Sequence, residues 1–527
     1  MAVERSGDVR AFRRDHGLSR RIPAAAVCGS AVAAGILVHP WATVGAVATL
    51  LLAAVCRVGR DSELPRVFLV ALGLLLLGYA FLGKGFAYLG YAPLYIGEAV
   101  LGLGFLAAVL GGGVRPLLRM PLTWLVVSFM LWGALRTLPY LATYRVDALR
   151  DAVLWGYAAF ALATAWALLR TGWLPRAVSG YARVLPWLLL WIPVGLLVFE
   201  FFPRALPAVP GSGGVAILHL KPGDMAVHLA GCTTFFVLGL HRTGRERARP
   251  LPWEWIWWAA VLAGFVLAGS QNRGGMFAFV AAFAVISLRG GFRSLWKPLL
   301  LGTIATSLFL FVGAQLDFGK GRRISPQQIM ANVESTFGGS SRPVLDGTRE
   351  WRLQWWTDIV DYTFFGGYFW TGKGFGINLA DDDGYQVHRR GKLRSPHNGH
   401  LSVLARAGVP GLGLWVLMQG VFALSLLRAH LRARATGRDG WARFDLWILA
   451  YWTAFVVNAS FDVFLEGPQA GICFWSLFGC GIAALELQRR ELREAAASPF
   501  PPARTFRTGG REAWVTRGRE TRVATIC

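Results

Sequence analysis

Charged side chains are scarce in this chain. Only 16% of its 527 residues are Asp, Glu, Lys or Arg, whereas 54% are hydrophobic, and the mean hydropathy is +0.45. Soluble proteins carry about 25% charged residues, so the composition excludes a soluble globular protein. The apolar residues form continuous runs of roughly 17–25 residues, unlike the short alternating segments of a β-barrel. The composition therefore predicts an all-α, polytopic integral membrane protein.

Cysteine and acidic residues are also few. The six cysteines form no CxxC pair and no metal-ligand spacing, and most lie in or beside apolar runs, as small buried side chains do. The 54 Lys and Arg exceed the 30 Asp and Glu, which gives a net charge of +24. The Arg residues cluster in short connections between apolar runs, so the positive-inside rule explains this excess and no nucleic-acid partner is expected.

The apolar runs predict about fourteen transmembrane spans, with twelve to fourteen as the range. We place them at 22–39, 41–57, 66–83, 94–113, 120–136, 150–169, 185–202, 225–241, 254–270, 274–289, 297–314, 401–427, 444–461 and 469–487. With the N-terminus inside, Arg-rich and Arg-poor connections alternate along the chain. Both termini are therefore predicted to be cytoplasmic, and the only long loop is predicted to be extracytoplasmic.

Five regions follow from this topology. They are a basic cytoplasmic N-terminus at 1–21, an N-terminal transmembrane bundle at 22–314, a long extracytoplasmic loop at 315–400 that carries short amphipathic helices, C-terminal transmembrane helices at 401–487, and a basic cytoplasmic tail at 488–527. The tail contains Pro and Gly and is expected to be disordered.

Arginines gather on the predicted outer side. Arg273 lies between two apolar runs in "AGSQNRGGMFAF", where a guanidinium is costly unless it snorkels to the interface or meets an anion. The stretch "GTREWRLQWWTDIVDY" predicts an interfacial helix with Trp351 and Trp355 on one face and Arg349 and Arg352 on another. Interface anchoring and bidentate phosphate binding both remain open for these arginines.

Polar residues also precede the span at 401–427. The segment "RSPHNGHLSVLARAG" contains His397, Asn398 and His400, and an imidazole can accept a proton near neutral pH. A helix-start role is the alternative, and the spacing is weak evidence for zinc, so the site is interpreted as metal-free. Upstream, "GYFWTGKG" resembles a P-loop but has Gly374 where Ser or Thr is required. We interpret it as a glycine-rich turn that allows close backbone approach.

Ionisable residues in or near membrane spans are functional hypotheses by default. The carboxylates of this kind are Glu98, Asp151, Glu200, Asp445 and Asp462, and Lys221 lies at the outer end of a predicted span. Asp462 is expected to emerge on the same side as His397.

These motifs together resemble the O-antigen ligase and O-antigen polymerase superfamily. The resemblance is carried by "SQNRGG", "TREWRL", "GKGFG" and "PHNGHLSVLARAGVPGLG" in the C-terminal two-fifths of the chain. The family pattern of Arg followed four residues later by Leu fits Arg349 and Leu353, and its His-x10-Gly pattern fits His397 and Gly408. An upstream SRG-like signature is matched only loosely by Ser270 and Arg273.

The resemblance implies metal-independent, inverting glycan transfer without a cofactor. The donor would be a glycan on undecaprenyl pyrophosphate and the acceptor a lipid or another glycan, at the outer face of a bacterial inner membrane among membrane lipids. Arg273 and Arg349, with the neighbouring Arg352, would bind the pyrophosphate, and His397 would act at the acceptor hydroxyl. Asn398, His400, Lys221 and Asp462 are possible supporting residues. An anionic-solute transporter and a non-catalytic scaffold of a polysaccharide export complex remain alternatives.

Overall fold

The computed structural model describes residues 63–242, 254–287, 316–317, 323–324, 343–387 and 393–497. Five helices there are long and apolar enough to cross a membrane: α4 (Leu64–Leu82), α7 with its continuation (Pro121–Tyr144), α11 (Leu174–Phe201), α19 (Gly399–Ala435) and α21 (Pro468–Ala497). A sixth is formed if α9 (Val146–Gly156) and α10 (Ala158–Thr171), bent by 46°, are counted as one span. The predicted class, a helical membrane protein, is confirmed.

The remaining elements complete the bundle and its connections. The helices are α5 (Ile96–Gly111), α6 (Arg115–Leu118), α8 (Leu141–Tyr144), α12 (Pro222–Val237), α13 (Glu254–Gln271), α14 (Arg273–Ile286), α17 (Pro343–Val360), α18 (Leu379–Asp382) and α20 (Asp439–Ala459), with short turns η1 (Lys84–Tyr88), η2 (Leu138–Tyr140), η3 (Leu240–Arg242) and η6 (Asp361–Phe365). Strands β1 (Gly90–Tyr91) and β2 (Leu94–Tyr95) pair antiparallel, as do β3 (Leu316–Asp317) and β4 (Arg323–Ile324).

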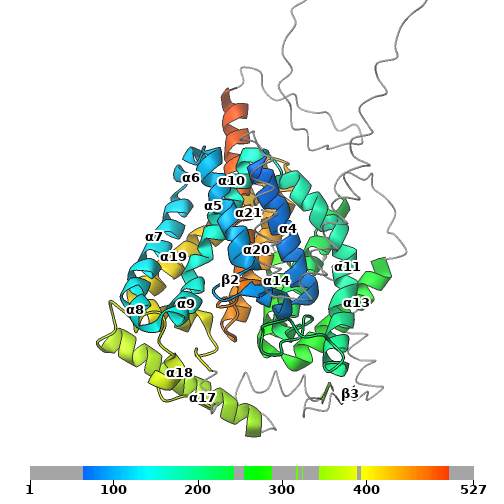
Figure 1. Ribbon diagram of the computed structural model, residues 1–527. Coiled ribbons are helices and arrows are strands. Elements are labelled where there is room, and N and C mark those ends of the chain that lie inside the picture. The colour runs from blue at the N-terminus through cyan, green and yellow to red at the C-terminus, as the bar shows by residue number, and fades with distance from the viewer. Residues whose placement is uncertain are drawn as a thin grey trace, which may run out of the picture.

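The helices pack as a bundle around α21 (Figure 1). Inside the protein, 78% of the apolar window of α21 is buried, against 22% for α7, so α21 is central and α7 leaves most of its surface for lipid. The most extensive contacts join α14 to α20, α10 to α21, and α19 to α20. Helices are the expected elements because backbone groups inside a bilayer must bond within their own segment.

Several predicted boundaries need correction. The predicted span 150–169 is divided between α9 and α10. Helix α11 begins at Leu174 rather than 185, because Pro175 in its first turn needs no hydrogen-bond partner. Helix α21 runs to Ala497, so residues 488–497, predicted to be disordered, are helical. The predicted spans 22–39, 41–57 and 297–314 lie outside the described residues, and the count of about fourteen stays a prediction.

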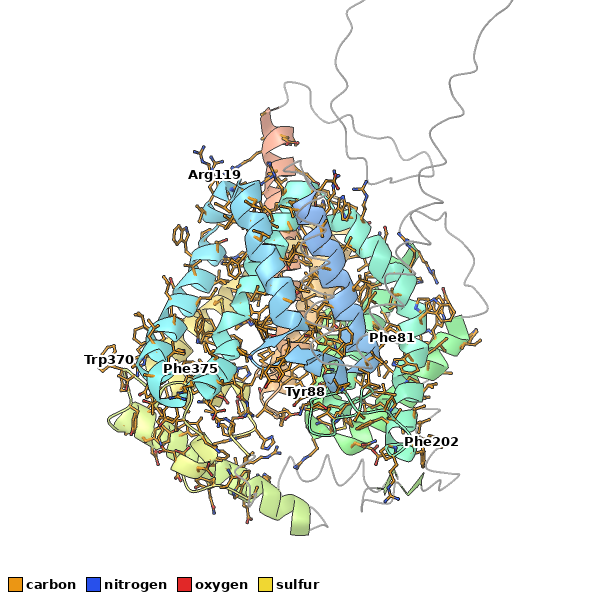
Figure 2. The ribbon with its side chains drawn as sticks, viewed as in Figure 1. Phe81, Tyr88, Arg119, Phe202, Trp370 and Phe375 are labelled. Carbon is orange, nitrogen blue, oxygen red and sulfur yellow. The ribbon has the colours of Figure 1, made fainter. Side chains whose placement is uncertain are left out.

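The bundle has two chemically different ends. The segments at 203–221, 361–387, 393–398 and 460–467, together with α17, form what we call the loop end, and Figure 2 shows Trp370 and Phe202 there and Arg119 at the opposite end. Arg119 lies in a predicted Arg-rich connection, and its separation from the loop end agrees with the predicted alternation of Arg-rich and Arg-poor connections. Which end faces the cytoplasm stays a prediction.

Helix α17 lies across the loop end, but its apolar face does not point to lipid. Trp355 and Ile359 are 0% exposed and pack against Leu379, Leu393 and Leu404 from the protein's own loop and helix α19. Trp355 also donates to Asp383 Oδ2 at 2.6 Å and stacks on Tyr385. Interface anchoring in lipid is therefore wrong for this face of the predicted interfacial helix, because protein side chains cover it.

The glycine-rich turn donates hydrogen bonds to backbone carbonyls at a kink in α19. Gly408 interrupts the helix with φ 71° and ψ −174°. The carbonyls of Ala405 and Arg406 accept instead from the backbone amides of Lys373 (2.7 Å) and Gly374 (3.0 Å). At Gly372, which has φ 57°, a Cβ would lie 2.5 Å from the Arg406 carbonyl carbon. The prediction that this turn allows close backbone approach is confirmed, and broken membrane helices need such partners.

Candidate functional site

An imidazole and a carboxylate meet at the loop end. Nδ1 of His397 lies 3.5 Å from Oδ1 of Asp462, at the long limit of a hydrogen bond. His397 is 29% exposed and Asp462 is 19% exposed, so the pair is partly open. Within the part of the chain that the structure describes, Nε2 of His397 has no hydrogen-bond partner. With Nδ1–H directed at the carboxylate, the Nε2 lone pair is available to accept a proton.

The backbone holds His397 in an uncommon conformation. Its φ is 54°, in the left-handed region, where few residues other than glycine occur and where strain often marks a functional site. The two neighbouring residues are fixed on either side. Trp356 Nε1 donates to the carbonyl of Pro396 at 2.7 Å, and Asn398 caps α19 by accepting from the His400 and Leu401 amides. His397 is therefore presented by a rigid turn.

Asp462 is ionised because its neighbours stabilise the negative charge of its carboxylate. Burial by itself would raise the pKa of Asp462, but the His397 imidazole and the Lys221 ammonium outweigh burial and hold this pKa at about 2. Its Oδ1 also accepts from the Val463 amide at 2.8 Å. In return, Asp224 and Asp462 outweigh the effect of burial and raise the pKa of Lys221. Lys221 immediately precedes α12, so α12 brings a third segment to the site.

Arg352 reaches the same turn from α17. Its Nη1 donates to the carbonyl of Phe461 at 3.3 Å. Burial and the charge of Arg273 lower the pKa of Arg352, whereas Asp462 opposes them, so the side chain interacts with both neighbours. A guanidinium stays protonated in proteins, and two guanidinium groups held near one another favour an anion between them.

Arg273 is brought there by the start of α14. Asn272 caps the helix by accepting from the Gly275 amide at 2.7 Å. A Cβ on Gly274 would lie 2.6 Å from Phe461 Cβ, so this position must be glycine for α14 to approach the Phe461–Asp462 turn. The "SQNRGG" motif is thus a helix cap followed by a close-packing glycine. Its two residues between Ser270 and Arg273 end one helix and start the next.

Arg349 lies one turn before Arg352 on α17 and is half-buried. Arg352, rather than Arg349, interacts with Arg273 and Asp462. The structure therefore brings together five of the predicted residues: Arg273, Arg352, Lys221, His397 and Asp462.

Asn398 and His400 have structural roles. Asn398 is the cap described above. His400 uses both ring nitrogens, because Nδ1 accepts from Trp415 Nε1 at 3.0 Å and Nε2 lies 3.1 Å from the carbonyl of Val456. Since Nδ1 is an acceptor, the proton must be on Nε2. Neither nitrogen is left for a substrate.

A second ionic cluster joins α9 to the glycine-rich turn. Oδ2 of Asp151 lies 2.9 Å from Arg406 Nη1 and 3.0 Å from Arg394 Nη2, and it accepts from the Gly376 amide at 3.0 Å. Arg406 is 1% exposed, so this is a buried ion-pair anchor between distant segments rather than a substrate site. The sequence indicated Asp151 as functional but carried no signal for its partners, which come from distant segments.

Among the described residues, no group of three or more His, Cys, Asp or Glu side chains is placed to hold a metal ion. Metal independence stays a prediction for experiment.

Comparison with known families agrees with the geometry. Residues 258–416 match a family model described as O-antigen ligase. The match runs from α13 into α19 and includes Arg273, Arg349, Arg352 and His397. Lys221 and Asp462 lie outside it. No curated protein sequence matches the chain.

Proposed function

On the premise of this family match over residues 258–416, we propose that the chain acts as an O-antigen ligase-type protein and transfers a glycan from undecaprenyl pyrophosphate to an acceptor hydroxyl. The observation that carries this proposal is the convergence of three cations with the His397–Asp462 pair at the loop end. The cations suit a pyrophosphate, and the His397–Asp462 pair suits a hydroxyl that must lose a proton. These are the two ends of a glycosyl transfer.

The cations would bind the donor pyrophosphate. Arg273 and Arg352 would bind phosphate oxygens, and Lys221 and Arg349 would lie at the edges of the same site. Their charge stabilises the leaving group as negative charge builds up on it, and preorganised cations do this without rearrangement. Mutual repulsion between Arg273 and Arg352 is relieved when the anion binds, which favours binding.

His397 would accept the proton of the acceptor hydroxyl through Nε2. The hydroxyl oxygen attacks the anomeric carbon and forms the new glycosidic bond. The bond from that carbon to the pyrophosphate oxygen breaks, and undecaprenyl pyrophosphate leaves with the electron pair. Attack opposite the leaving group inverts the anomeric configuration. Asp462 positions the ring and stabilises the imidazolium, as the carboxylate does in other Asp–His pairs.

The loop end would then face the outside of a bacterial inner membrane, with both termini in the cytoplasm. Lipid-linked glycan donors would enter from the membrane between helices. The acceptor is a lipid in a ligase or another lipid-linked glycan in a polymerase, and the site chemistry is the same for both.

The test is reconstitution in detergent. Purified protein is incubated with a lipid-linked oligosaccharide and with each acceptor in turn, with a chelator present, and release of undecaprenyl pyrophosphate is measured with glycan transfer. We expect acceptor-dependent release in the wild type and its loss in His397→Ala and Arg273→Ala. Arg119→Ala, an exposed arginine at the opposite end, is the matched control.

Folded protein that binds the donor but releases no pyrophosphate with any acceptor would overturn the proposal and favour a transporter or scaffold. Activity that disappears with chelator and returns with a metal would overturn metal independence alone.

A further inference from the structure

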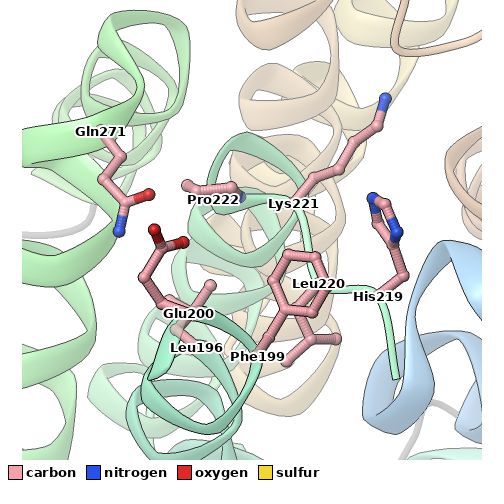
Figure 3. A pocket seen from close by; sticks show the side chains of 8 residues that line it. All are labelled: Leu196, Phe199, Glu200, His219, Leu220, Lys221, Pro222 and Gln271. Carbon is pink, nitrogen blue, oxygen red and sulfur yellow. The ribbon is translucent and has the colours of Figure 1, made fainter. Parts of the chain in front are cut away.

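A small cavity opens beside the cation site. It has a volume of about 230 Å³ and lies between the end of α11, the segment leading into α12 and the end of α13. Its lining includes Glu200, His219, Lys221 and Gln271, with Phe199 forming an aromatic wall (Figure 3). Pockets for drug-sized ligands measure roughly 300–1,000 Å³, so this one suits a single ring rather than a chain.

Backbone bonds hold the wall of the cavity in place. The His219 amide donates to the Leu82 carbonyl, and the His219 carbonyl accepts from the Lys84 amide, both at 2.9 Å. The His219 ring packs on Phe199 with centroids 4.8 Å apart. The cavity is therefore preformed, which reduces the ordering cost of binding.

Two polar side chains face each other across this cavity. Figure 3 shows the Glu200 carboxylate and the Gln271 amide directed toward one another, while Lys221 extends away from them. Within the described residues, neither Glu200 nor Gln271 has a hydrogen-bond partner. A half-buried carboxylate and amide without partners favour a ligand that supplies both donors and acceptors.

The charge of Glu200 selects among ligands. A carboxylate accepts hydrogen bonds from hydroxyl groups and repels phosphate, so Glu200 disfavours the pyrophosphate on its own side of the cavity, away from Lys221. The aromatic wall suits the C–H face of a ring, as in pockets that combine apolar surface with a few polar groups. A hydroxylated sugar ring meets each of these conditions.

The cavity is connected to the reaction site through two of its residues. Lys221 interacts with Asp462, and Gln271 ends α13 immediately before the Asn272 cap of Arg273. We propose that this cavity is a sugar-binding subsite, in which Glu200 and Gln271 hold the hydroxyl groups of one ring of the glycan substrate. This inference rests on the proposed glycan transfer. The ring belongs either to the donor, next to the pyrophosphate, or to the acceptor.

The test measures kcat and KM separately for donor and acceptor in the reconstituted reaction. The variants are Glu200→Gln, Gln271→Ala and the double variant, with Asp361→Asn, an exposed carboxylate outside the cavity, as control. A lost hydrogen bond to a charged group corresponds to about a 10- to 100-fold change. We expect KM for one substrate to rise about 10-fold in Glu200→Gln and less in Gln271→Ala.

The substrate whose KM rises identifies the source of the ring. KM in the double variant should rise by less than the product of the two single-variant rises, because both residues hold one ligand. Unchanged KM values for both substrates in active Glu200→Gln and Gln271→Ala would overturn the subsite. Absence of turnover in the wild type would instead overturn the proposed function, so the two failures are distinguishable.

Discussion

Nδ1 of His397 lies 3.5 Å from Oδ1 of Asp462, and helix α17 holds the segments that carry both residues. Trp356 bonds to the carbonyl before His397, and Arg352, one turn away on the same helix, bonds to the carbonyl before Asp462. The helix that supplies a phosphate-binding arginine therefore also sets the distance within the pair.

Replacing Asp462 should affect turnover more than binding. We expect Asp462→Asn to lower kcat by about 10²- to 10⁴-fold, the range that general-base catalysis contributes, with donor KM changed little. Asp462→Glu should restore part of kcat because it keeps the charge. The check is steady-state kinetics on folded protein. An equal loss in both variants, with a raised donor KM, would indicate a structural role instead.

Substitutions at the two arginines of α17 should reduce activity to different extents. Arg352 interacts with Arg273 and Asp462, so Arg352→Ala should cost more in kcat/KM than Arg349→Ala, by about 10-fold or more. Arg352→Lys should recover little, since an ammonium cannot bind bidentately. Donor titrations with the three variants provide the comparison. A larger loss in Arg349→Ala would contradict this assignment.

His400 should matter for stability rather than chemistry. Removing its ring leaves Trp415 Nε1 without its partner in a buried setting and takes one hydrogen-bond contact from the Val456 carbonyl. We expect His400→Ala to lower the free energy of unfolding by roughly 1–3 kcal/mol while the folded fraction keeps its specific activity within a few-fold. Activity normalised to monodisperse protein is the measurement. Loss of activity as complete as in His397→Ala would refute it.

A side chain at Gly372 should destabilise the protein, because Gly372 packs against the backbone at the kink of α19. A Cβ there meets backbone at 2.5 Å, and φ is 57°, so Gly372→Ala should destabilise by about 2 kcal/mol or more. Gly413→Ala is the control, because that helical position has no atom within 4 Å of a Cβ; it should be neutral or stabilise by up to ~1 kcal/mol. Thermal unfolding in detergent would distinguish them, and similar midpoints would contradict the kink's role.

Acid should lower the folding stability of the protein by protonating Asp462. Its pKa is held at about 2, whereas a free Asp has a pKa of about 3.9. The ionised form therefore contributes stability that is fully present above about pH 4 and is lost as pH falls through about 2. The contribution is on the order of 2 kcal/mol.

The measurement is the unfolding midpoint between pH 6 and pH 2.5. The wild type should lose more stability over this range than Asp462→Asn, and Asp361→Asn should behave as the wild type does. Parallel curves for wild type and Asp462→Asn would show that Asp462 gains nothing from its neighbours.

Composition and local spacing were enough to predict a helical membrane protein, a glycine-rich turn of close approach and the superfamily. The bilayer allows few backbone arrangements, so apolar run length alone indicates helices. The same motifs indicated Arg273 and His397, because an arginine and an imidazole beside membrane spans are costly without a function.

Only the tertiary structure decided which of the polar residues meet. Arg349 and Arg352 are equivalent in the sequence, but the direction in which α17 crosses the loop end brings Arg352 to Asp462. His397 and His400 are three residues apart, yet one faces a carboxylate and the other is enclosed by Trp415 and Val456. The Trp face of α17, typical of a lipid anchor, is covered by protein. These outcomes depend on packing between distant segments, about which local spacing carries no information.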